Sequence, residues 1–463
     1  MTPARPLRPP SALLVVALMV LGAALSGCGD APGEQSTETT SMSSPAPVAA
    51  GEWSAELAVP GGPLRFGLVF AEHDQGLRAW IVNGAERIDV PRVTWEAGTL
   101  TLHIDHYDSR LTATPGDGGR RLAGLWTKRR GAGSWAELPF AATHASVAAP
   151  DPWPPPPPPV RAALTGRFAV HFEGDDDPAV GLFHVAGSGA ASGTFLTTTG
   201  DYRYLSGGVT AEGRLELSAF DGAHAFLFHL TGNGAGPGDG PRLSGRFWSG
   251  DWFEQAFTAR PDSEATVADP LAGTRFTGLP DEPLDLGALR FPDLDGVVRG
   301  LDDPAFAGRA RLIQLFGSWC PNCSDACALL AELHEAYADR GLSIVGLAFE
   351  LTGDAERDAE QVRRYAARHG VTWPLLVAGL ADKAEAGKAV PFLDRVRSFP
   401  TTVFLHGDGR VRAVWQGFAG PATGSAHADL RATFEELIEE LLAGAPADGA
   451  APAGVAHPGG GGG

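Results

Sequence analysis

The chain has 463 residues, of which 44% are hydrophobic, and its formal net charge at pH 7 is -19. This length is too great for one ordinary domain and predicts about three, and the composition is that of soluble globular domains. The acidic balance argues against nucleic-acid binding as the function.

The N-terminus has the pattern of an export signal. Arg5 and Arg8 precede an apolar run over 12–21, which is too short and too poorly flanked for a stable transmembrane span. Leu25-Ser26-Gly27-Cys28 follows and resembles a bacterial lipobox, in which the cysteine is lipidated and becomes the first residue of the mature protein. We therefore expect residues 1–28 to be a lipoprotein signal peptide and the protein to be exported to the cell envelope or periplasm, anchored to a membrane by its acyl chains. Ordinary cleavage beside a stray cysteine is the alternative.

Two β-rich regions follow a short tether. Residues 29–50 are rich in Ser, Thr, Pro and Ala, which predicts a flexible segment. Short alternating runs divided by turn residues fill 51–146 and again 164–261, and they predict two antiparallel all-β modules, each a barrel or a sandwich. Between them, the linker 147–163 contains the proline run 154–159, which favours a polyproline II spacer over an SH3-type ligand.

The second β-module repeats the pattern of the first. The segment Gly51-Glu52-Trp53-Ser54-Ala55 matches Gly166-Arg167-Phe168-Ala169-Val170, and other segments match at a similar offset of roughly 115 to 120 residues. Further matches join 93–94 to 209–210 and 122–126 to 243–248. We interpret the modules as an internal duplication. Since they hold no obvious chemical constellation, we expect a spacer or docking platform outside the catalyst.

Four of the histidines in these modules have two aspartates nearby, Asp105 and Asp221. Their positions lack the fixed close spacing of a metal motif such as HExxH, so solvated strand histidines are favoured over a metal site. The histidines are His103, His106, His224 and His229.

The stretch Trp319-Cys320-Pro321-Asn322-Cys323 places two cysteines where a buried strand, 312–316, turns into a helix that continues to Gly341. At the N-terminus of a helix, unpaired backbone N–H groups and the helix dipole favour a thiolate. A dithiol in this position is typical of thioredoxin-like redox proteins. We expect Cys320 to be the nucleophile and Cys323 the resolving thiol. A zinc site would need a second Cys or His pair, which the sequence does not provide.

Later segments continue an α/β pattern. Residues 343–349 predict a second buried strand, and Asp354 can cap a helix that ends at His369 before Gly370. The strand beginning at Phe399-Pro400 is unusual unless that peptide bond is cis. The tail 444–463 consists mostly of Gly, Ala and Pro and is predicted to be disordered.

The order of these segments resembles the TlpA/ResA-like thiol-disulfide oxidoreductases of the thioredoxin superfamily. The match is carried by WCPNC, GLAFELTGD at 346–354, FPTT at 399–402 and GFAGPATG at 417–424. The resemblance implies an α/β thioredoxin-like domain over 280–443, an enzyme without a metal or other cofactor that exchanges disulfides with protein substrates, mainly as a reductase. It also implies a membrane redox partner that recycles the dithiol. Within the site, it implies that cis-Pro400 faces the dithiol and that Trp319, Phe399 and Thr401 contact the substrate.

The proton acceptor for Cys323 departs from the family pattern. Gln314 stands where thioredoxin has a buried acid, and Ala326 stands where many relatives are acidic. We therefore expect Glu350 to take this role, since it ends a strand beside the active-site strand. A surface carboxylate without a catalytic role is the alternative for Glu350.

Two other functions stay open at this point. A thioredoxin-fold peroxidase would carry Thr three residues before the reactive cysteine, where this chain has Gly317. A copper-binding or redox-sensing protein would use Cys323 and Cys327 as a CxxxC pair with a distant histidine, for which His406 is the candidate. Otherwise Cys327 is a small apolar residue of the core.

Overall fold

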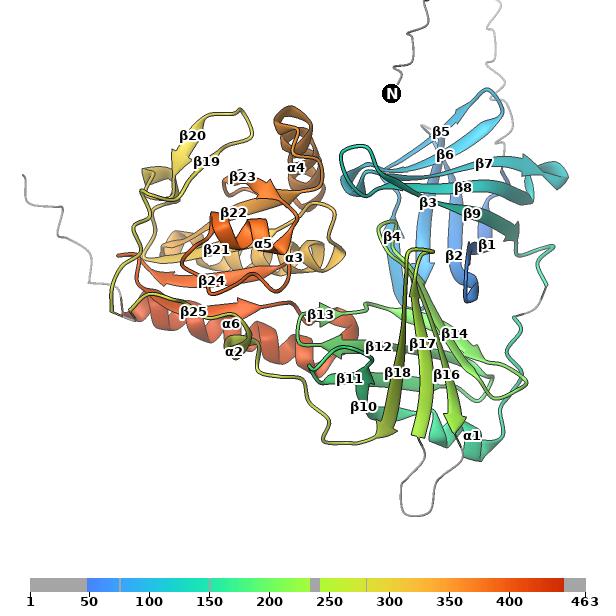
Figure 1. The fold of residues 1–463 in the computed structure, drawn as a ribbon. Helices are drawn as coiled ribbons and strands as arrows, with labels where there is room; N and C mark the ends of the chain where they lie inside the picture. Colours follow the sequence, from blue (N-terminus) through green and yellow to red (C-terminus); the bar gives the residue numbers. More distant parts are fainter. Residues whose placement is uncertain (1–47, 75, 150, 234–241, 280, 445–463) are drawn as a thin grey trace, which may run out of the picture. The chain divides into compact units, whose positions relative to one another are not determined.

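In the computed structural model, antiparallel sheets in the first half of the chain precede an α/β domain (Figure 1). The structure describes residues 48–74, 76–149, 151–233, 242–279 and 281–444. The predicted signal peptide, Cys28, nearly all of the tether and the tail from 445 therefore lie outside the described residues. Within the described ranges, every helix is too short or too polar to cross a bilayer.

The first β-module is one antiparallel sheet with the strand order β4-β3-β2-β1-β9-β8-β7-β6-β5. Alternate residues of its strands are buried, as a sheet with one face toward a core requires. Its elements are β1 (Gly51–Val59), β2 (Gly62–His73), β3 (Gly76–Asn83), β4 (Glu86–Asp89), β5 (Arg92–Glu96), β6 (Thr99–Ile104), η1 (Asp105–Tyr107), β7 (Ser109–Gly116), η2 (Asp117–Gly119), β8 (Arg121–Arg129) and β9 (Trp135–His144).

The second β-module has the order β11-β10-β18-β17-β16-β15-β14-β12-β13, and β11 also pairs with β12. This last pairing closes the sheet into a barrel, whereas the described strands of the first sheet do not close. Its elements are α1 (Pro158–Ala163), β10 (Gly166–Phe172), β11 (Ala179–Val185), β12 (Ala190–Thr197), β13 (Gly200–Asp201), β14 (Leu205–Val209), β15 (Leu215–Phe220), β16 (Ala225–Asn233), β17 (Arg242–Ser249) and β18 (Phe253–Pro261).

The two sheets share a topological feature that agrees with the predicted duplication. In each, the first strand lies between the second and the last: β1 between β2 and β9, and β10 between β11 and β18. The linker between them is less extended than a spacer, because α1 begins within the proline run. It also packs on the barrel, where Gly208 and Gly189 leave space for Trp153 and the backbone of Pro154.

The C-terminal domain is built on a mixed sheet with the order β23-β22-β21-β24-β25. The strand predicted over 312–316 is β21, an interior strand that pairs parallel to β22 on one side and antiparallel to β24 on the other. Its elements are α2 (Pro270–Gly273), β19 (Arg290–Pro292), β20 (Val298–Gly300), η3 (Pro304–Phe306), β21 (Ala310–Phe316), α3 (Pro321–Tyr337), η4 (Ala338–Arg340), β22 (Leu342–Glu350), α4 (Ala355–His369), β23 (Leu375–Leu380), α5 (Lys383–Ala389), β24 (Thr401–His406), β25 (Val411–Gln416), η5 (Pro421–Thr423) and α6 (Ser425–Ala443).

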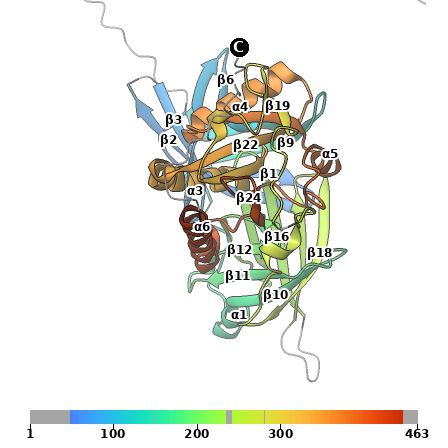
Figure 2. The same ribbon diagram turned by 90° about the vertical axis from the view of Figure 1, so that its left-hand side faces the viewer.

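Helix α3 lies between two other helices of this domain, as the turned view shows for α6 (Figure 2). Tyr365 of α4 donates a hydrogen bond to the Cys323 carbonyl, and Arg431 of α6 forms an ion pair with Glu332 of α3. Leu315 near the end of β21 pairs with Thr401 at the start of β24. The end of the active-site strand and the segment after Pro400 therefore meet at one edge of the sheet.

Candidate active site

The two cysteines occupy the first turn of α3. Cys320 is the N-cap, Pro321 is the first helical residue, and the Cys323 backbone N–H donates to Cys320 Sγ at 3.2 Å. Both are free thiols, with Cys320 6% exposed and Cys323 fully buried. The helix end therefore directs a backbone donor at the outer sulfur, which stabilises a thiolate there.

The inner thiols are held in their protonated form by the protein interior. Burial, followed by the hydrogen bond and charge of Cys320, raises the pKa of Cys323 well above its ordinary value. Burial also raises the pKa of Cys327 to about 11. Cys327 is 1% exposed and belongs to the hydrophobic core. Cys320 is the least buried of the three, and its sulfur accepts a hydrogen bond from the Cys323 N–H.

The Phe399–Pro400 peptide bond is cis, as the sequence predicts. The Cys320 thiol donates to the Phe399 carbonyl at 3.5 Å, so the two segments are in direct contact. Trp319 meets the edge of the Phe399 ring with centroids 6.0 Å apart, and its Nε1 donates to the Phe349 carbonyl. Thr401 is fully buried, and its hydroxyl donates to the Ser398 carbonyl. Its side chain therefore points into the protein and not toward the predicted substrate surface.

Glu350 is a buried carboxyl next to the dithiol turn. Its two oxygens accept hydrogen bonds from the Ser318 N–H at 2.8 Å and the Ser318 hydroxyl at 2.6 Å. Burial is the main cause that raises the pKa of Glu350, to about 8, and its negative charge contributes to the raised pKa of Cys323. Gln314 is also buried, but its amide does not titrate near neutral pH. Glu350 is thus an internal group that can gain or lose a proton at neutral pH.

His406 is remote from the cysteines. It pairs with Ala310 at the start of β21, whereas the dithiol follows the end of that strand at Phe316. Six residues of strand correspond to roughly 20 Å. The structure therefore does not bring His406 into a site with Cys323 and Cys327.

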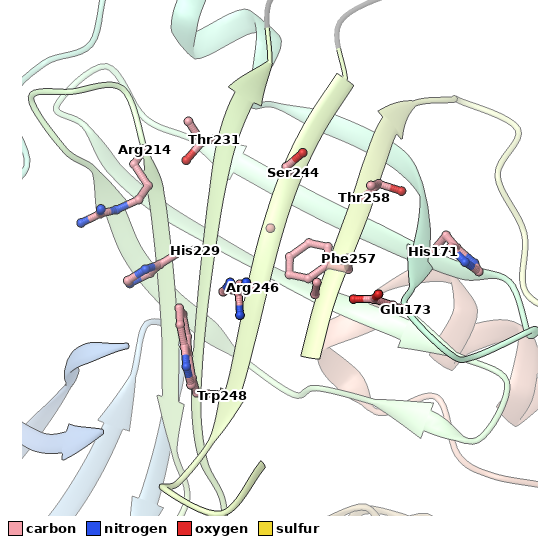
Figure 3. Close-up of a pocket in the computed structure, with 12 residues that line it drawn as sticks. His171, Glu173, Arg214, His229, Thr231, Ser244, Arg246, Trp248, Phe257 and Thr258 are labelled. Carbon is pink, nitrogen blue, oxygen red and sulfur yellow. The ribbon is translucent and has the colours of Figure 1, made fainter. Parts of the chain in front are cut away.

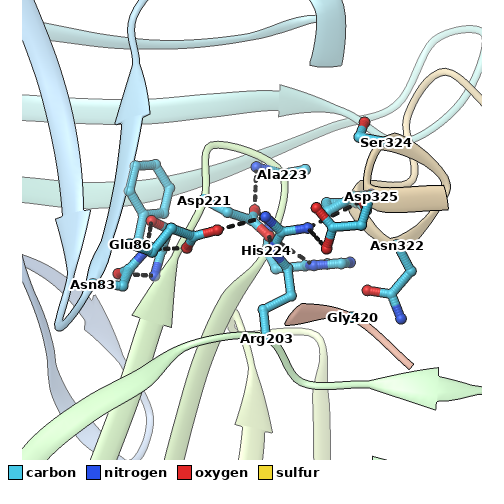
Figure 4. Close-up of polar contacts among 12 residues, drawn as sticks. Asn83, Glu86, Arg203, Asp221, Ala223, His224, Asn322, Ser324, Asp325 and Gly420 are labelled. Carbon is cyan, nitrogen blue, oxygen red and sulfur yellow. Dashed lines mark hydrogen bonds and ion pairs between the residues drawn. The ribbon is translucent and has the colours of Figure 1, made fainter. Parts of the chain in front are cut away.

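The β-modules also contribute residues to the surroundings of the dithiol, and no motif in the sequence indicates these residues. Asn322, between the two cysteines, donates to the Asp201 carbonyl at 3.2 Å, and Tyr107 donates to the Ser324 hydroxyl at 3.1 Å. Arg203 contacts the same helix end (Figure 4). No local motif marks these residues, because Asp201-Tyr202-Arg203-Tyr204 reads as an ordinary strand and turn. The unusual property of Arg203 is the burial of its charged side chain, and burial cannot be seen in the sequence.

Of His103, His106, His224 and His229, only His106 is buried. The side chains of the other three are 19%, 27% and 16% exposed, respectively. His106 is 4% exposed and lies in η1, and burial lowers its pKa to about 3. His224 is paired with Asp221 at 3.1 Å. His229 lines a cavity of about 590 Å³ on the barrel together with His171 of β10, Arg246 of β17 and other residues on or beside β16, β17 and β18 (Figure 3). Packing against neighbouring elements, which strand periodicity does not reveal, buries the His106 ring and partly covers the other rings.

Comparison with known proteins finds similarity over part of the chain. No family model matches the chain. It is 29% identical over 110 residues to the thioredoxin-like protein YneN of Bacillus subtilis (strain 168), covering 24% of this chain and 58% of that protein. It is 25% identical over 119 residues to the thiol-disulfide oxidoreductase ResA of Bacillus thuringiensis (strain Al Hakam), covering 26% of this chain and 60% of that protein. The chain contains a domain of the thioredoxin superfamily.

Part of the chain is also similar to solved structures. A thiol:disulfide interchange protein of the thioredoxin family from Chlorobium tepidum TLS is 20% identical, with a TM-score of 0.26, and the match covers 36% of this chain and 97% of that one. The chain spans less than two thirds of the length of the curated relatives it matches. These comparisons address only part of the chain.

Proposed function

We propose that this protein is an exported, lipid-anchored thiol-disulfide oxidoreductase of the TlpA/ResA type, acting mainly as a reductase of protein disulfides. The observation that carries the proposal is the Cys320 sulfur at the N-terminus of α3, hydrogen-bonded by the Cys323 N–H and in contact with the cis-proline segment. Lipidation of Cys28, a location in the cell envelope and recycling by a membrane redox partner belong to the same proposal.

The reaction is two successive thiol-disulfide exchanges. The Cys320 thiolate attacks one sulfur of a substrate disulfide, which breaks the S–S bond, releases one substrate thiolate and forms a mixed disulfide. Cys323 then loses its proton to the Glu350 carboxylate and attacks Cys320 Sγ. The second substrate thiolate leaves, and Cys320 and Cys323 are left as a disulfide that the membrane partner reduces with two electrons and two protons.

Glu350 suits the second step for an electrostatic reason. A base with a pKa near the working pH transfers protons efficiently, and burial brings this carboxyl to about 8. Its hydrogen bonds to Ser318, two residues before Cys320, fix it at the dithiol turn. Trp319 and the cis segment at Phe399 form the proposed substrate contact, with Thr401 contributing through its backbone.

The other two functions have less support. A Cβ at Gly317 would lie 2.2 Å from Nε1 of Trp319, so the threonine that a peroxidase would carry there does not fit beside this indole. Copper binding through Cys323 and Cys327 lacks the third ligand proposed for it, because His406 lies at the other end of β24. Neither alternative uses the contact between Cys320 and the cis segment.

Exchange of Cys323 for alanine tests the assignment of the two thiols. Cys323→Ala keeps the nucleophile and removes the group that releases the substrate, so substrates should accumulate as mixed disulfides on Cys320. Cys320→Ala should trap little, because Cys323 is fully buried. Non-reducing gels of the exported full-length protein would show the adducts, and mass spectrometry would identify the trapped cysteine.

Cys327→Ala is the matched control, since Cys327 lies one helical turn further into the same helix. It should retain wild-type turnover of insulin disulfides and form no adducts. Adducts on Cys323 in the Cys320→Ala protein, or lost turnover in Cys327→Ala, would contradict the proposed roles.

A further inference from the structure

Arg203 of the second β-module reaches the first turn of α3. Its side chain is 10% exposed, and its Nη1 donates to the Pro321 carbonyl at 3.1 Å and to Asp325 Oδ2 at 2.5 Å (Figure 4). Pro321 stands between the two cysteines, and Asp325 follows Cys323 by two residues. A guanidinium from outside the thioredoxin-like domain is therefore held against the peptide that carries the dithiol.

The same guanidinium is bound by carboxylates from both β-modules. Glu86 of β4 accepts from Nη2 at 2.5 Å, and Asp221, which follows β15, lies 3.6 Å from Nε. Asp221 is held in turn by His224, whose Nδ1 lies 3.1 Å from Asp221 Oδ2. Three carboxylates from separate segments, Asp325 included, thus converge on one buried cation.

The backbone around Arg203 is fixed to the same surface. Arg203 has a left-handed conformation with φ 56°, and its N–H donates to Asp201 Oδ2. Asp201 Oδ1 accepts from the Gly420 N–H at 3.0 Å, and the Asp201 carbonyl accepts from Asn322. The arginine is therefore anchored through its main chain as well as its side chain, so the position of its charge relative to α3 is defined.

We infer that Arg203 is a positioning residue of the redox site, which holds the dithiol turn through Pro321 and Asp325 and stabilises the reduced, thiolate-bearing form of the protein. This inference rests on the proposed dithiol function. A cation at the N-terminal turn of α3 stabilises a thiolate there, as the helix dipole does, whereas the Asp325 carboxylate destabilises it. The β-modules are thereby part of the redox unit rather than the spacer or docking platform that the sequence suggests.

The equilibrium between the protein and the glutathione couple tests this inference. In that reaction the dithiol gives two electrons and two protons to oxidised glutathione, which yields the Cys320–Cys323 disulfide and two reduced glutathiones. Arg203→Met removes the cation and should raise the equilibrium constant for oxidation about tenfold, which for this two-electron couple lowers the potential by about 30 mV. Asp325→Asn removes the opposing charge and should lower the same constant several-fold.

Opposite shifts distinguish a charge effect from a loss of structure, which would move both variants in the same direction. Asp177→Asn is the matched control, because Asp177 joins the second β-module to Arg397 of the thioredoxin-like domain without touching α3. Its equilibrium constant should stay within twofold of wild type. If Arg203→Met does not fold, Arg203→Lys replaces it and should shift the constant in the same direction by a smaller factor.

The inference is overturned if the arginine variant and Asp325→Asn both stay within twofold of wild type, or if they shift in the same direction. It is also overturned if Asp177→Asn shifts as far as the arginine variant. Insulin reduction by the wild-type protein tests the proposed function separately. A wild type that equilibrates with glutathione but leaves insulin unreduced would refute that function while the role of Arg203 is still decided by the variants.

Discussion

Two carboxyls near the dithiol are held in an interior that favours their neutral form. Burial is the main cause that raises the pKa of Asp201 to about 7 and that of Glu350 to about 8. A group whose pKa is higher in the folded than in the unfolded protein contributes stability that is present at low pH and lost as pH rises through the folded value. Through both residues, the stability of the protein therefore falls as the pH rises from mildly acidic to mildly alkaline values.

Glu350→Gln should remove part of this pH dependence. The pKa of Glu350 is raised from 4.5 to about 8, and each pKa unit corresponds to about 1.4 kcal/mol. As the pH rises through this window, the unfolding free energy of wild type should therefore fall by on the order of 4 kcal/mol relative to that of the variant. Urea denaturation of both proteins at several pH values from 5 to 9 would measure it, with the stability difference growing as pH rises.

An exposed carboxylate of α3 serves as the control for this prediction. Glu335→Gln should show the wild-type dependence of unfolding free energy on pH, because this side chain is in solvent. A Glu350→Gln protein whose stability parallels wild type across the range would show that Glu350 is already ionised in the folded protein.

Residues marked by a local motif were predictable, while residues brought in by distant contacts were not. Cys320, Cys323 and Pro400 stand in short patterns whose spacing fixes a helix start or a cis bond, and the structure places them together. Arg203 and Asp201 meet α3 from more than a hundred residues away in sequence. Their position depends on how a barrel packs on a helix end, which no local pattern encodes.

At the scale of elements, the turn between β12 and β13 packs on the loop that follows β25. Gln416 donates to the Thr198 carbonyl, and the backbone of Thr199 lies directly beside Gly417. A Cβ at Gly417 would come within 2.7 Å of the Thr199 carbonyl carbon, and Gly417 has φ 75°. Because the atoms nearest to this Cβ belong to the backbone, a change of side-chain rotamer cannot relieve the clash.

Gly417→Ala should therefore destabilise the protein by more than its backbone conformation alone requires. Adding a methyl group to a packed site typically costs about 1–3 kcal/mol, in addition to about 1–2 kcal/mol for a left-handed alanine. Gly370→Ala is the matched control, because Gly370 has φ 62° at the C-cap of α4 with nothing within 4 Å of an added Cβ. Chemical denaturation of both variants would compare them, and equal losses would show that the β12–β13 turn does not confine Gly417.

Strand and helix positions followed from sequence periodicity, but sheet closure did not. The cap at Asp354 and the stop at Gly370 bound α4 as predicted, because capping is a local interaction. The alternating runs gave the strands of both modules. In the second module β11 also pairs with β12, whereas the described strands of the first sheet have no equivalent pairing. This difference depends on the curvature that accumulates over a whole sheet.

At the scale of the whole molecule, the two β-modules share a hydrophobic core. The cluster built from the first sheet includes Phe220, Leu227 and Trp248 of the second. Phe66 lies 4.6 Å from Phe220, centroid to centroid. Modules that bury side chains in one cluster lose that burial together, so we expect them to unfold in a common transition.

Asn83→Ala tests this coupling, because Asn83 joins the modules through polar contacts buried in the shared region. Its side chain is fully buried, donates to the Phe220 carbonyl at 2.9 Å and accepts from the Phe220 N–H at 3.0 Å. Removing it leaves both backbone groups of Phe220 without these partners, at a cost of about 1–3 kcal/mol for each unsatisfied group. Urea denaturation should therefore show a loss of roughly 2–6 kcal/mol, whereas Arg78→Ala, which breaks the exposed ion pair with Asp89, should lose less than about 1 kcal/mol. Equal losses in the two variants would show that the modules are stable independently of this buried contact.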